Sequence, residues 1–417
     1  MKFQTKDTQN KYVFFEMMSI TYPIVEKRIA LETTRYRWIV LFSLFYSFVA
    51  YAFVFQMVPP LVGSIMQQFS ITSSAQAGLL MTIVVIPGIL LALPAGLIVD
   101  RYGVRLIGFV STVLAAVGSL MTAMANSFPT LLFGRLILGI GGAFIVTATP
   151  TIIPQWFSRE ELGKAMGFYG TNMPLATVTA FPIASVLLLS YDWRFPFYLG
   201  AIVAAIASVV FVSFVREGPL KHKERSQSVN ARHALANIEL WKASLVWLFF
   251  QVAAISFLSW GPKLFQEYKG LDPVNSSLLA SVLMLAAIAF VPLNGWLSDR
   301  IGRRKPFLVI GSFSMAVALV ASSYALGSTL IISVMILGMA AAMVPPVVST
   351  LAAEISESDA VGIGFGMLAL CMNIGVALAA PLLGYFVDVT DSLMLSFAGI
   401  AAFSVAGAIV AYTLKTK

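Results

Sequence analysis

The chain has 417 residues, of which 59% are hydrophobic and 11% are charged, and its mean hydropathy is +0.88. Soluble domains carry about 25% charged residues, so this balance excludes a soluble enzyme or binding module and predicts an integral membrane protein. The formal charge of +8 does not indicate nucleic-acid binding, because the basic residues follow the loop pattern described below.

Residues 1–35 are polar and mixed in charge, and they show no signal-peptide pattern. We expect them to form a cytoplasmic tail, and Met17 and Met18 leave open where translation begins. The one cysteine, Cys371, lies in an apolar run, so neither an intramolecular disulfide nor a thiolate metal site is expected. We therefore predict no metal and no cofactor.

Twelve apolar runs follow the tail, each long enough to cross a hydrocarbon core of about 30 Å at about 1.5 Å per residue. We expect membrane helices at residues 37–62, 75–98, 106–125, 128–153, 163–190, 194–215, 241–266, 275–297, 306–325, 328–351, 361–387 and 392–414. The sequence thus predicts four parts, which are a tail at residues 1–35, a six-helix bundle at 36–215, a polar linker at 216–240 and a second bundle at 241–417.

The basic residues gather in the loops on one side of this arrangement. Of the 27 Lys and Arg, all but four fall in segments that are cytoplasmic if the N-terminus is inside, and the exceptions are Arg135, Arg194, Lys263 and Lys269. This asymmetry predicts that both termini lie in the cytoplasm. We expect a multi-pass protein of a prokaryotic inner or plasma membrane, embedded in the lipid bilayer.

A ten-residue motif occurs twice, with every shared residue separated from its counterpart by 199 positions (299 − 100, for example). The first copy contains Gly96, Asp100, Arg101, Gly103 and Arg105, and the second contains Gly295, Asp299, Arg300, Gly302 and Arg304. The same offset relates Gly139 to Gly338 and Pro182 to Pro381. Such a duplication is typical of transporter folds built from repeats.

Both copies match G-x-x-x-D-R-x-G-x-R, the signature between helices two and three of the major facilitator superfamily, which residues 36–414 resemble. The resemblance implies an all-α membrane protein, with twelve transmembrane helices in two pseudo-symmetric six-helix bundles. It also implies a monomeric secondary transporter that moves a small-molecule substrate by alternating access. In the family, Asp100 and Arg101 would brace the cytoplasmic side of the outward-facing state at the start of helix eleven, and Asp299 and Arg300 would mirror them.

The motif residues also have a physical reading of their own. Gly96 and Gly295 lack side chains, so another helix can approach closely at these positions. Asp100 and Asp299 can accept hydrogen bonds from the free N–H groups at the start of a neighbouring helix.

The superfamily lines its central cavity with helices one, four, seven and ten, where this chain has few polar residues. We expect substrate contacts from Arg135, Tyr46, Tyr51, Gln56, Gln251, Trp260 and Lys263. Ser333 is a further polar residue on the tenth run. The three aromatic residues fit a packing role equally well, and Lys263 equally fits a lysine at the membrane interface.

Arg135 is the strongest candidate, because an unpaired charge in hydrocarbon costs about 3 kcal/mol and so needs a function or a partner. It begins the sequence Arg135-Leu136-Ile137-Leu138-Gly139-Ile140-Gly141, which is similar to the family's R-x-x-x-G-x-G on helix four. Its counterpart in the second half is Val334 (135 + 199), which favours substrate contact over a scaffold role. The alternative is that Arg135 extends to the surface or bonds to carbonyls of a neighbouring helix.

No Asp or Glu lies in the middle of any predicted span, so the cavity is expected to be positive or neutral. This favours a carrier of a small organic anion or zwitterion, such as a carboxylate, an amino acid or a short peptide, acting by uniport or exchange. The segments Pro154-Gln155-Trp156-Phe157 and Lys164-Ala165-Met166-Gly167 are similar to those of cyanate-type and organic-anion porters. The alternative is a proton-coupled exporter of amphipathic drugs.

Other functional classes find little support. No nucleophile, base and orienting acid fall together in any segment, so we expect no enzymatic activity. A receptor would need a signalling domain that neither the tail nor the linker could hold. The eighth run lacks the arginine expected of nitrate and nitrite porters, and the fifth run lacks the G-x-x-x-G-P-x-x-G-G pattern of drug and proton antiporters.

Two loops carry local signals. Ser158 and Glu161 fit a capping box before the fifth run. The segment Tyr191-Asp192-Trp193-Arg194 is predicted to anchor a helix end at the outer membrane interface.

Overall fold

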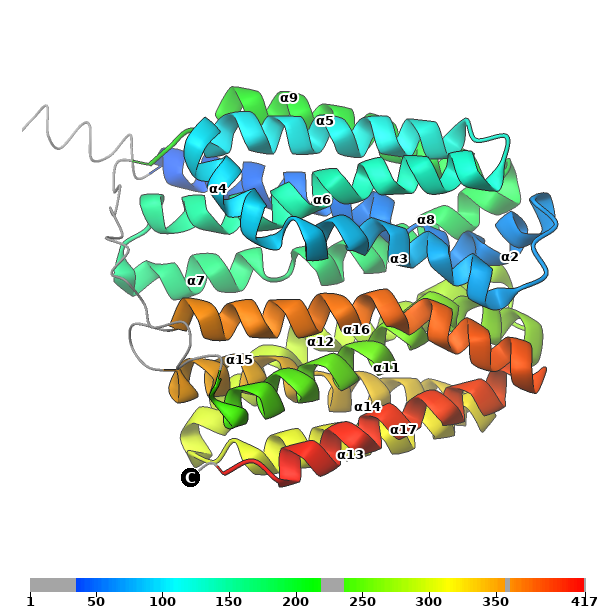
Figure 1. The fold of residues 1–417 in the computed structure, drawn as a ribbon. Coiled ribbons are helices and arrows are strands. Elements are labelled where there is room, and N and C mark those ends of the chain that lie inside the picture. Colours follow the sequence, from blue (N-terminus) through cyan, green and yellow to red (C-terminus); the bar gives the residue numbers. More distant parts are fainter. Residues whose placement is uncertain (1–34, 219–235, 357–360, 416–417) are drawn as a thin grey trace, which may run out of the picture.

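The structure, a computed structural model, describes residues 35–218, 236–356 and 361–415. The predicted N-terminal tail and most of the predicted linker lie outside these residues. The described chain folds into long helices that run roughly parallel to one another, and Figure 1 shows the helices of the first half lying beside those of the second.

The first half begins with a helix at residues 35–55 and continues with α2 (Val58–Gln68), α3 (Ser74–Leu90), α4 (Ala92–Tyr102), α5 (Val104–Ala123), α6 (Phe128–Trp156), α7 (Arg159–Tyr169), α8 (Asn172–Ser190) and α9 (Phe195–Phe214). The second half contains α11 (Ile238–Lys269), α12 (Pro273–Ile301), α13 (Lys305–Tyr324), α14 (Gly327–Ala341), α15 (Val344–Ile355), α16 (Val361–Thr390) and α17 (Leu393–Tyr412).

These helices confirm the predicted membrane spans. Among the described residues, 11 helical segments are long and apolar enough to cross a membrane. The remaining span is α3, which continues into α4 after a break at Leu91. The first span ends at Gln68 rather than near residue 62, because α2 extends it. The fold is therefore all-α, with twelve transmembrane helices in two six-helix bundles.

Some spans are interrupted where prolines remove backbone donors. The first span breaks after Phe55, directly before Pro59 and Pro60, and α15 follows a break that precedes Pro345 and Pro346. A proline has no N–H to donate to the carbonyl four residues earlier, so in lipid that carbonyl needs another partner. The break in the first span bears directly on the candidate site.

The two ends of the molecule are distinguished by the loops that they carry. We call the end where the described chain stops at Gly218 and resumes before Asn237 the linker face, which lies on the left in Figure 1. The opposite end carries the loops at residues 69–73, 124–127 and 391–392 and is called the distal face.

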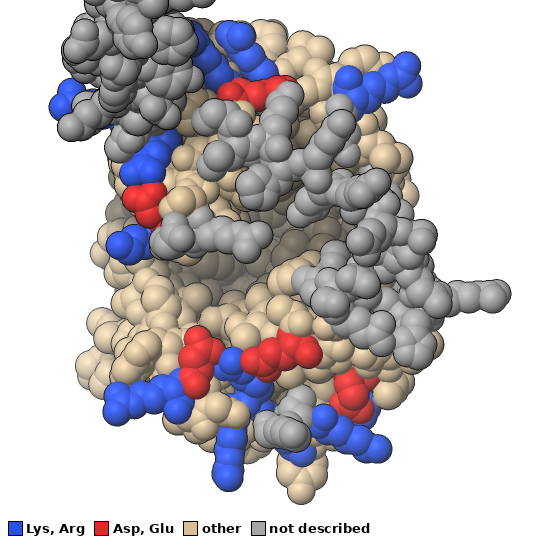
Figure 2. All heavy atoms as spheres, turned by 90° about the vertical axis from the view of Figure 1, so that its left-hand side faces the viewer, with Lys and Arg blue, Asp and Glu red and all other residues tan. Residues whose placement is uncertain are grey.

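The two halves pack against each other towards the distal face. There α2 packs on α11, α3 on α16 and α8 on α12, whereas the linker-side segments α4 and α7 pack on helices of their own half. The apolar core of the second half also takes in Val62, Ile71 and Phe181 from the first half. Figure 2 views the linker face and shows it hollowed between the two halves, with charged side chains on either side of the hollow. The molecule is thus closed at the distal face and open towards the linker face.

The predicted capping box before the fifth run is wrong. The side chain of Ser158 makes no capping hydrogen bond with α7, and Glu161, the expected second member of the capping box, instead accepts two hydrogen bonds from Arg37. In the segment predicted to anchor a helix end, Trp193 is only 2% exposed and packs against Phe197, whereas Tyr191 is 65% exposed. At Glu161 a tertiary contact thus prevails over the local sequence signal.

Candidate functional site

Arg135 lies on α6 and is fully buried, with 0% of the residue exposed. Its guanidinium donates three hydrogen bonds to backbone carbonyls, from Nη1 to Val54 at 3.1 Å, from Nη2 to Phe55 at 3.1 Å and from Nε to Leu80 at 3.2 Å. It also lies 5.8 Å from the centre of the Phe55 ring. Of the two structural alternatives for this arginine, the structure shows the bonds to carbonyls of neighbouring helices, and the side chain does not extend to the surface.

The break in the first span explains why these carbonyls accept from Arg135. Pro59 stands four residues after Phe55 and has no N–H, so it cannot donate to the Phe55 carbonyl as a helical residue would. The planar guanidinium fork can bond the adjacent carbonyls of Val54 and Phe55 at once. Arg135 thus supplies side-chain donors in place of the backbone N–H that the interrupted helix lacks, at a point where the first, second and fourth spans meet.

The charge of Arg135 is not balanced by a nearby acid in the described part of the chain. The ion pairs found there join other residues, and none of them includes Arg135. Carbonyl dipoles stabilise a guanidinium but carry no net charge. A buried, unpaired cation therefore gives the interior of the first bundle a positive potential.

Tyr51 lies beside this arginine on the first helix. Its ring stacks on that of Phe55, with the ring centroids 6.4 Å apart and an interplanar angle of 15°. The hydroxyl occupies the space next to Gly142 of α6, where a Cβ atom would clash with the Tyr51 oxygen. Tyr51 and Arg135 are thus brought together through Phe55, and Gly142 makes room for the phenol.

Gln56 and Tyr46 belong to the same span, Tyr46 in its first helix and Gln56 directly after that helix, but they bond in other directions. Gln56 is 4% exposed, and its Nε2 donates to the Thr177 hydroxyl of α8 at 2.6 Å. The Tyr46 hydroxyl donates to the Val203 carbonyl of α9 at 3.3 Å. Gln56 therefore lies at the break beside the Arg135 acceptors, whereas Tyr46 lies against α9.

Trp260 and Lys263 form a second group, on the distal part of α11. The indole of Trp260 donates to the Ala380 carbonyl at 3.1 Å, and the residue is 1% exposed. The Lys263 ammonium lies 5.4 Å from the centre of the Trp260 ring and pairs with Glu267 at 3.6 Å. Lys263 therefore already has a carboxylate partner, unlike Arg135.

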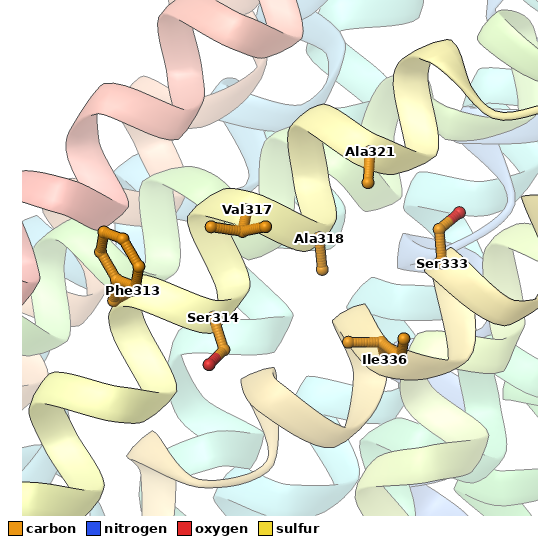
Figure 3. Close-up of a pocket in the computed structure, with 7 residues that line it drawn as sticks. All are labelled: Phe313, Ser314, Val317, Ala318, Ala321, Ser333 and Ile336. Atoms are coloured by element: carbon orange, nitrogen blue, oxygen red, sulfur yellow. The ribbon is translucent and has the colours of Figure 1, made fainter.

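Gln251 and Ser333 occupy two further positions in the second half. Gln251 is half-buried on α11, where a Cβ atom built on Gly375 of α16 would lie 2.9 Å from its Cβ. Ser333 does not face the central hollow: it lies with Ser314 in a groove between α13 and α14 (Figure 3). The groove is otherwise lined by apolar side chains, which belong to Phe313, Val317, Ala318, Ala321 and Ile336. Ser333, the further polar residue of the tenth run, thus lines this groove.

The first copy of the repeated motif makes its described contacts within its own half. Gly103 adopts φ +83°, a conformation that favours glycine, between α4 and α5. Arg105 donates to the Val212 carbonyl at 2.6 Å, and the guanidinium of Arg101 lies 5.5 Å from the centre of the Tyr102 ring. A Cβ atom at Gly96 would meet no atom within 4 Å, so the close helix approach expected there is not made in this conformation. The side chain of Asp100 lies outside the described part of the structure.

The second copy forms a charge network centred on Arg304, whose partner Glu354 is not part of the motif. Arg304 is 9% exposed and donates from Nη2 to Glu354 at 2.7 Å and from Nη1 to Ser298 at 2.9 Å. Its Nη1 also pairs with Asp299 at 2.6 Å. The hydrogen bond with Glu354, supported by Asp299, raises the pKa of the Arg304 guanidinium above its ordinary value. The motif thereby ties α12 to the end of α15.

Other residues of the second copy shape the end of α12 and its contact with α15. Gly302 ends α12 in the left-handed region at φ +68°. The guanidinium of Arg300 lies 5.3 Å from the centre of the Trp296 ring. A Cβ atom at Gly295 would lie 3.4 Å from Cβ of Pro346, so α12 and α15 are in close contact there. Among the described residues, no three His, Cys, Asp or Glu side chains gather where they could hold a metal ion.

Comparison with known proteins places these features in context. The profile of the family described as Major Facilitator Superfamily matches residues 44–291 and 264–417. A nitrite extrusion protein of Bacillus subtilis (strain 168) is 28% identical over 249 residues, which are 58% of this chain and 62% of that protein. A hexuronate transporter of the same organism is 23% identical, with 80% and 84% of the two chains covered. A probable nitrate transporter of Staphylococcus carnosus (strain TM300) is 26% identical, with 89% and 94% covered.

A solved structure shares the fold. The crystal structure of a bacterial homologue of the human lysosomal transporter Spinster, in an inward-facing and occupied conformation, superposes with a TM-score of 0.78. The two chains are 17% identical, and the match covers 91% of this chain and 97% of the other. At this identity the likeness shows the fold alone.

Proposed function

Because the chain belongs to the Major Facilitator Superfamily and is a secondary transporter, we propose that it carries a small organic anion or zwitterion by alternating access. The substrate would be a carboxylate, an amino acid or a short peptide, moved by uniport or exchange. Arg135 carries this proposal, because it is a fully buried cation that bonds to three carbonyls and pairs with no acid among the described residues.

The physical reason is the potential of this charge. At about 8 Å and an effective dielectric constant of about 20, a unit positive charge attracts a unit negative charge by about 2 kcal/mol. In this conformation most of the guanidinium N–H groups already bond to carbonyls. Arg135 can therefore attract an anionic substrate at a distance without giving up these hydrogen bonds. Tyr51 and Phe55 provide an adjoining aromatic surface for the non-ionic part of a substrate.

The relatives support the same class of substrate. Those reported above are named as transporters of nitrite, hexuronate and nitrate, which are all anions. This chain lacks an arginine in the central part of α12, where nitrate and nitrite porters are expected to have one. An organic anion therefore fits better than an inorganic one.

We further propose that the linker face is cytoplasmic and the distal face extracellular. The support is the charge census, since nearly all Lys and Arg lie in segments on the linker side. On this assignment, the hollow seen in Figure 2 opens towards the cytoplasm. The motif contacts of Asp100 and Arg101 with helix eleven would then form only after the linker face closes.

Uptake into proteoliposomes tests the proposal, with glucuronate, glutamate and a dipeptide as probes. Arg135→Ala should abolish uptake of the anionic probe that the wild type carries. Arg135→Lys should restore it poorly, because one ammonium cannot replace a fork that bonds carbonyls of two spans. Loss of the interaction between the guanidinium and the substrate should weaken the apparent affinity for the anionic probe by roughly ten- to a hundredfold.

Arg194→Lys is the matched control, since this arginine lies on the distal face and pairs with Asp192 at 3.1 Å. It makes the same chemical change without touching α6 and should leave uptake unchanged. If Arg135→Lys transports the anion as well as Arg194→Lys does, the guanidinium has no specific role. Uptake of a cationic amphiphile alone would instead favour the drug exporter.

A further inference from the structure

Asp388, at the distal end of α16 in the second half, bonds to the start of α3 in the first half. Its carboxylate accepts hydrogen bonds from the backbone N–H of Ser74 at 2.7 Å, from the N–H of Ala75 at 3.1 Å and from the Ser73 hydroxyl at 2.8 Å. Free N–H groups at a helix start and the helix dipole both favour a negative charge there. One carboxylate of the second half thus satisfies donors that belong to the first half.

The repeat offers an internal comparison, because the counterpart of Ser73 is Asp272 (73 + 199). Asp272 caps its own helix α12, accepting from Val274 and Asn275 at 3.0 Å each. The counterpart of Asp388 is Leu189 (388 − 199), which cannot accept a hydrogen bond through its side chain. The two pseudo-equivalent interfaces therefore differ: the start of α12 is capped by Asp272 of its own half, whereas the start of α3 has its own cap, the Ser73 hydroxyl accepting from the Gln76 N–H at 3.2 Å, and is also bonded by Asp388 across the interface.

The backbones are in very close contact below this carboxylate. A Cβ atom at Gly384 of α16 would clash with the Ser74 carbonyl oxygen, and one at Gly78 of α3 would lie 2.6 Å from the nitrogen of Pro381. One turn further in, the Thr82 hydroxyl donates to the Ala377 carbonyl at 2.6 Å. Glycines at these positions let the two helices come into contact. The hydrogen bonds of Asp388 therefore add to an α3–α16 interface that is otherwise mostly van der Waals contact.

We propose that Asp388 is the distal latch, meaning the carboxylate that holds the distal face closed by bonding to Ser73, Ser74 and Ala75. Alternating access requires the distal ends of α3 and α16 to separate, which breaks these three hydrogen bonds together. The latch sets the balance between the two conformations whatever the substrate is. It rests on the transporter fold and not on the proposed choice of an anion.

Labelling of a half-buried engineered cysteine tests the latch without any substrate. In a Cys371→Ser background, Thr82→Cys places a thiol beneath the closed surface, and an impermeant thiol reagent is added to intact cells. Asp388→Asn should raise the labelling rate of Thr82→Cys about tenfold, since charged hydrogen bonds to a helix start are lost. Asn126→Cys, in the exposed loop between α5 and α6, shows that the reagent reaches the distal face.

Ser74→Pro is a second variant that reaches the same contact from the other side. Ser74 is the first residue of α3, a position that tolerates proline, and the change removes the N–H that Asp388 accepts. It should raise the labelling rate less than Asp388→Asn does, and adding it to Asp388→Asn should produce little further rise. Asp391→Asn removes the same charge three residues away and should leave the labelling rate unchanged.

The latch is overturned if well-folded Asp388→Asn protein labels no faster than Asp391→Asn protein. It is also overturned if Ser74→Pro accelerates labelling equally with and without the Asp388 carboxylate. Neither result would bear on the anion proposal, which is judged by uptake.

Discussion

The Nη2 atom of Arg135 donates to the Phe55 carbonyl at 3.1 Å, and Phe55 stands four residues before Pro59, which has no N–H to offer that carbonyl. An arginine on the fourth span thus completes the hydrogen bonding of the first. The same side chain is the unpaired buried cation on which the proposed anion selectivity rests. Its structural and functional contributions therefore have to be separated by experiment.

Pro59→Ala should weaken the structural contribution of Arg135. The substituted residue would supply a helical N–H for the Phe55 carbonyl, so that carbonyl would no longer depend on the arginine. We expect Arg135→Ala to destabilise the wild-type protein by about 3 kcal/mol, and to cost about 1 kcal/mol less in the Pro59→Ala background. Thermal unfolding of the four proteins in detergent measures this coupling.

Pro60→Ala is the matched control for this cycle, because its new N–H would serve the Gln56 carbonyl, which Arg135 does not bond. The cost of Arg135→Ala should be the same with and without Pro60→Ala. Equal coupling for both prolines would show that the effect comes from general stiffening of the helix rather than from the Phe55 carbonyl.

Glu354→Gln should destabilise the second half modestly. The change gives position 354 the residue found at its counterpart, Gln155 (354 − 199), and removes one of the two carboxylates that pair with Arg304. Because Glu354 is partly exposed, we expect a loss of about 1 kcal/mol. Arg304→Lys should cost more, because the fork also bonds Ser298.

Arg105→Lys serves as the comparison in the first half, where the described partner of this arginine is the Val212 carbonyl. It should lower the melting temperature less than Arg304→Lys does. An equal or larger effect of Arg105→Lys would show that the Arg304 network adds no specific stability.

A cysteine pair should lock the distal face closed. The hydroxyl oxygens of Ser185 on α8 and Ser277 on α12 are 2.6 Å apart, and both residues are 0% exposed. In a Cys371→Ser background, Ser185→Cys with Ser277→Cys should form a disulfide on mild oxidation. Transport should stop and return after reduction, whereas Ser277→Cys alone should be insensitive to oxidation. Full transport by the cross-linked protein would mean that these helices do not separate during the cycle.

Flux should persist when the pH gradient is collapsed. The acidic residues of the described spans lie in the first or last turns of their helices. Among these residues, none is therefore placed in the middle of a bundle, where a carboxylate could take up and release a proton during transport. Substrate-driven uptake in the presence and absence of a protonophore checks this expectation. Loss of uptake with the protonophore would point to proton coupling and favour the drug-exporter alternative.

The sequence predicts the fold well because its signals are strong and repeated. Apolar runs long enough to span a bilayer, together with the doubled motif, define twelve helices and two bundles. Contacts between distant segments are harder to predict. Nothing in the sequence around Ser158 shows that Glu161 bonds Arg37 instead, and nothing around Asp388 shows that its partner is Ser74.

The candidate site was predictable only in part. The energetic cost of burying a charge identified Arg135 as a candidate. Its partners were predictable in principle from Pro59 and Pro60, because a proline leaves the carbonyl four residues earlier without its helical N–H donor. The sequence could not show that Tyr46 turns to α9 or that Ser333 lies between α13 and α14. Helix rotation decides which way such residues point, and it depends on packing with several neighbours at once.

A thermal-shift measurement on the purified protein tests the anion proposal most directly, because a ligand that binds only the folded state raises the melting temperature. The probes are glucuronate, glutamate, a dipeptide, nitrate and a cationic amphiphile, each applied to wild type, Arg135→Lys and Arg194→Lys. We predict that an organic anion or zwitterion stabilises wild type and Arg194→Lys but not Arg135→Lys. Stabilisation by the cationic amphiphile alone, or an equal shift in Arg135→Lys, would contradict the account.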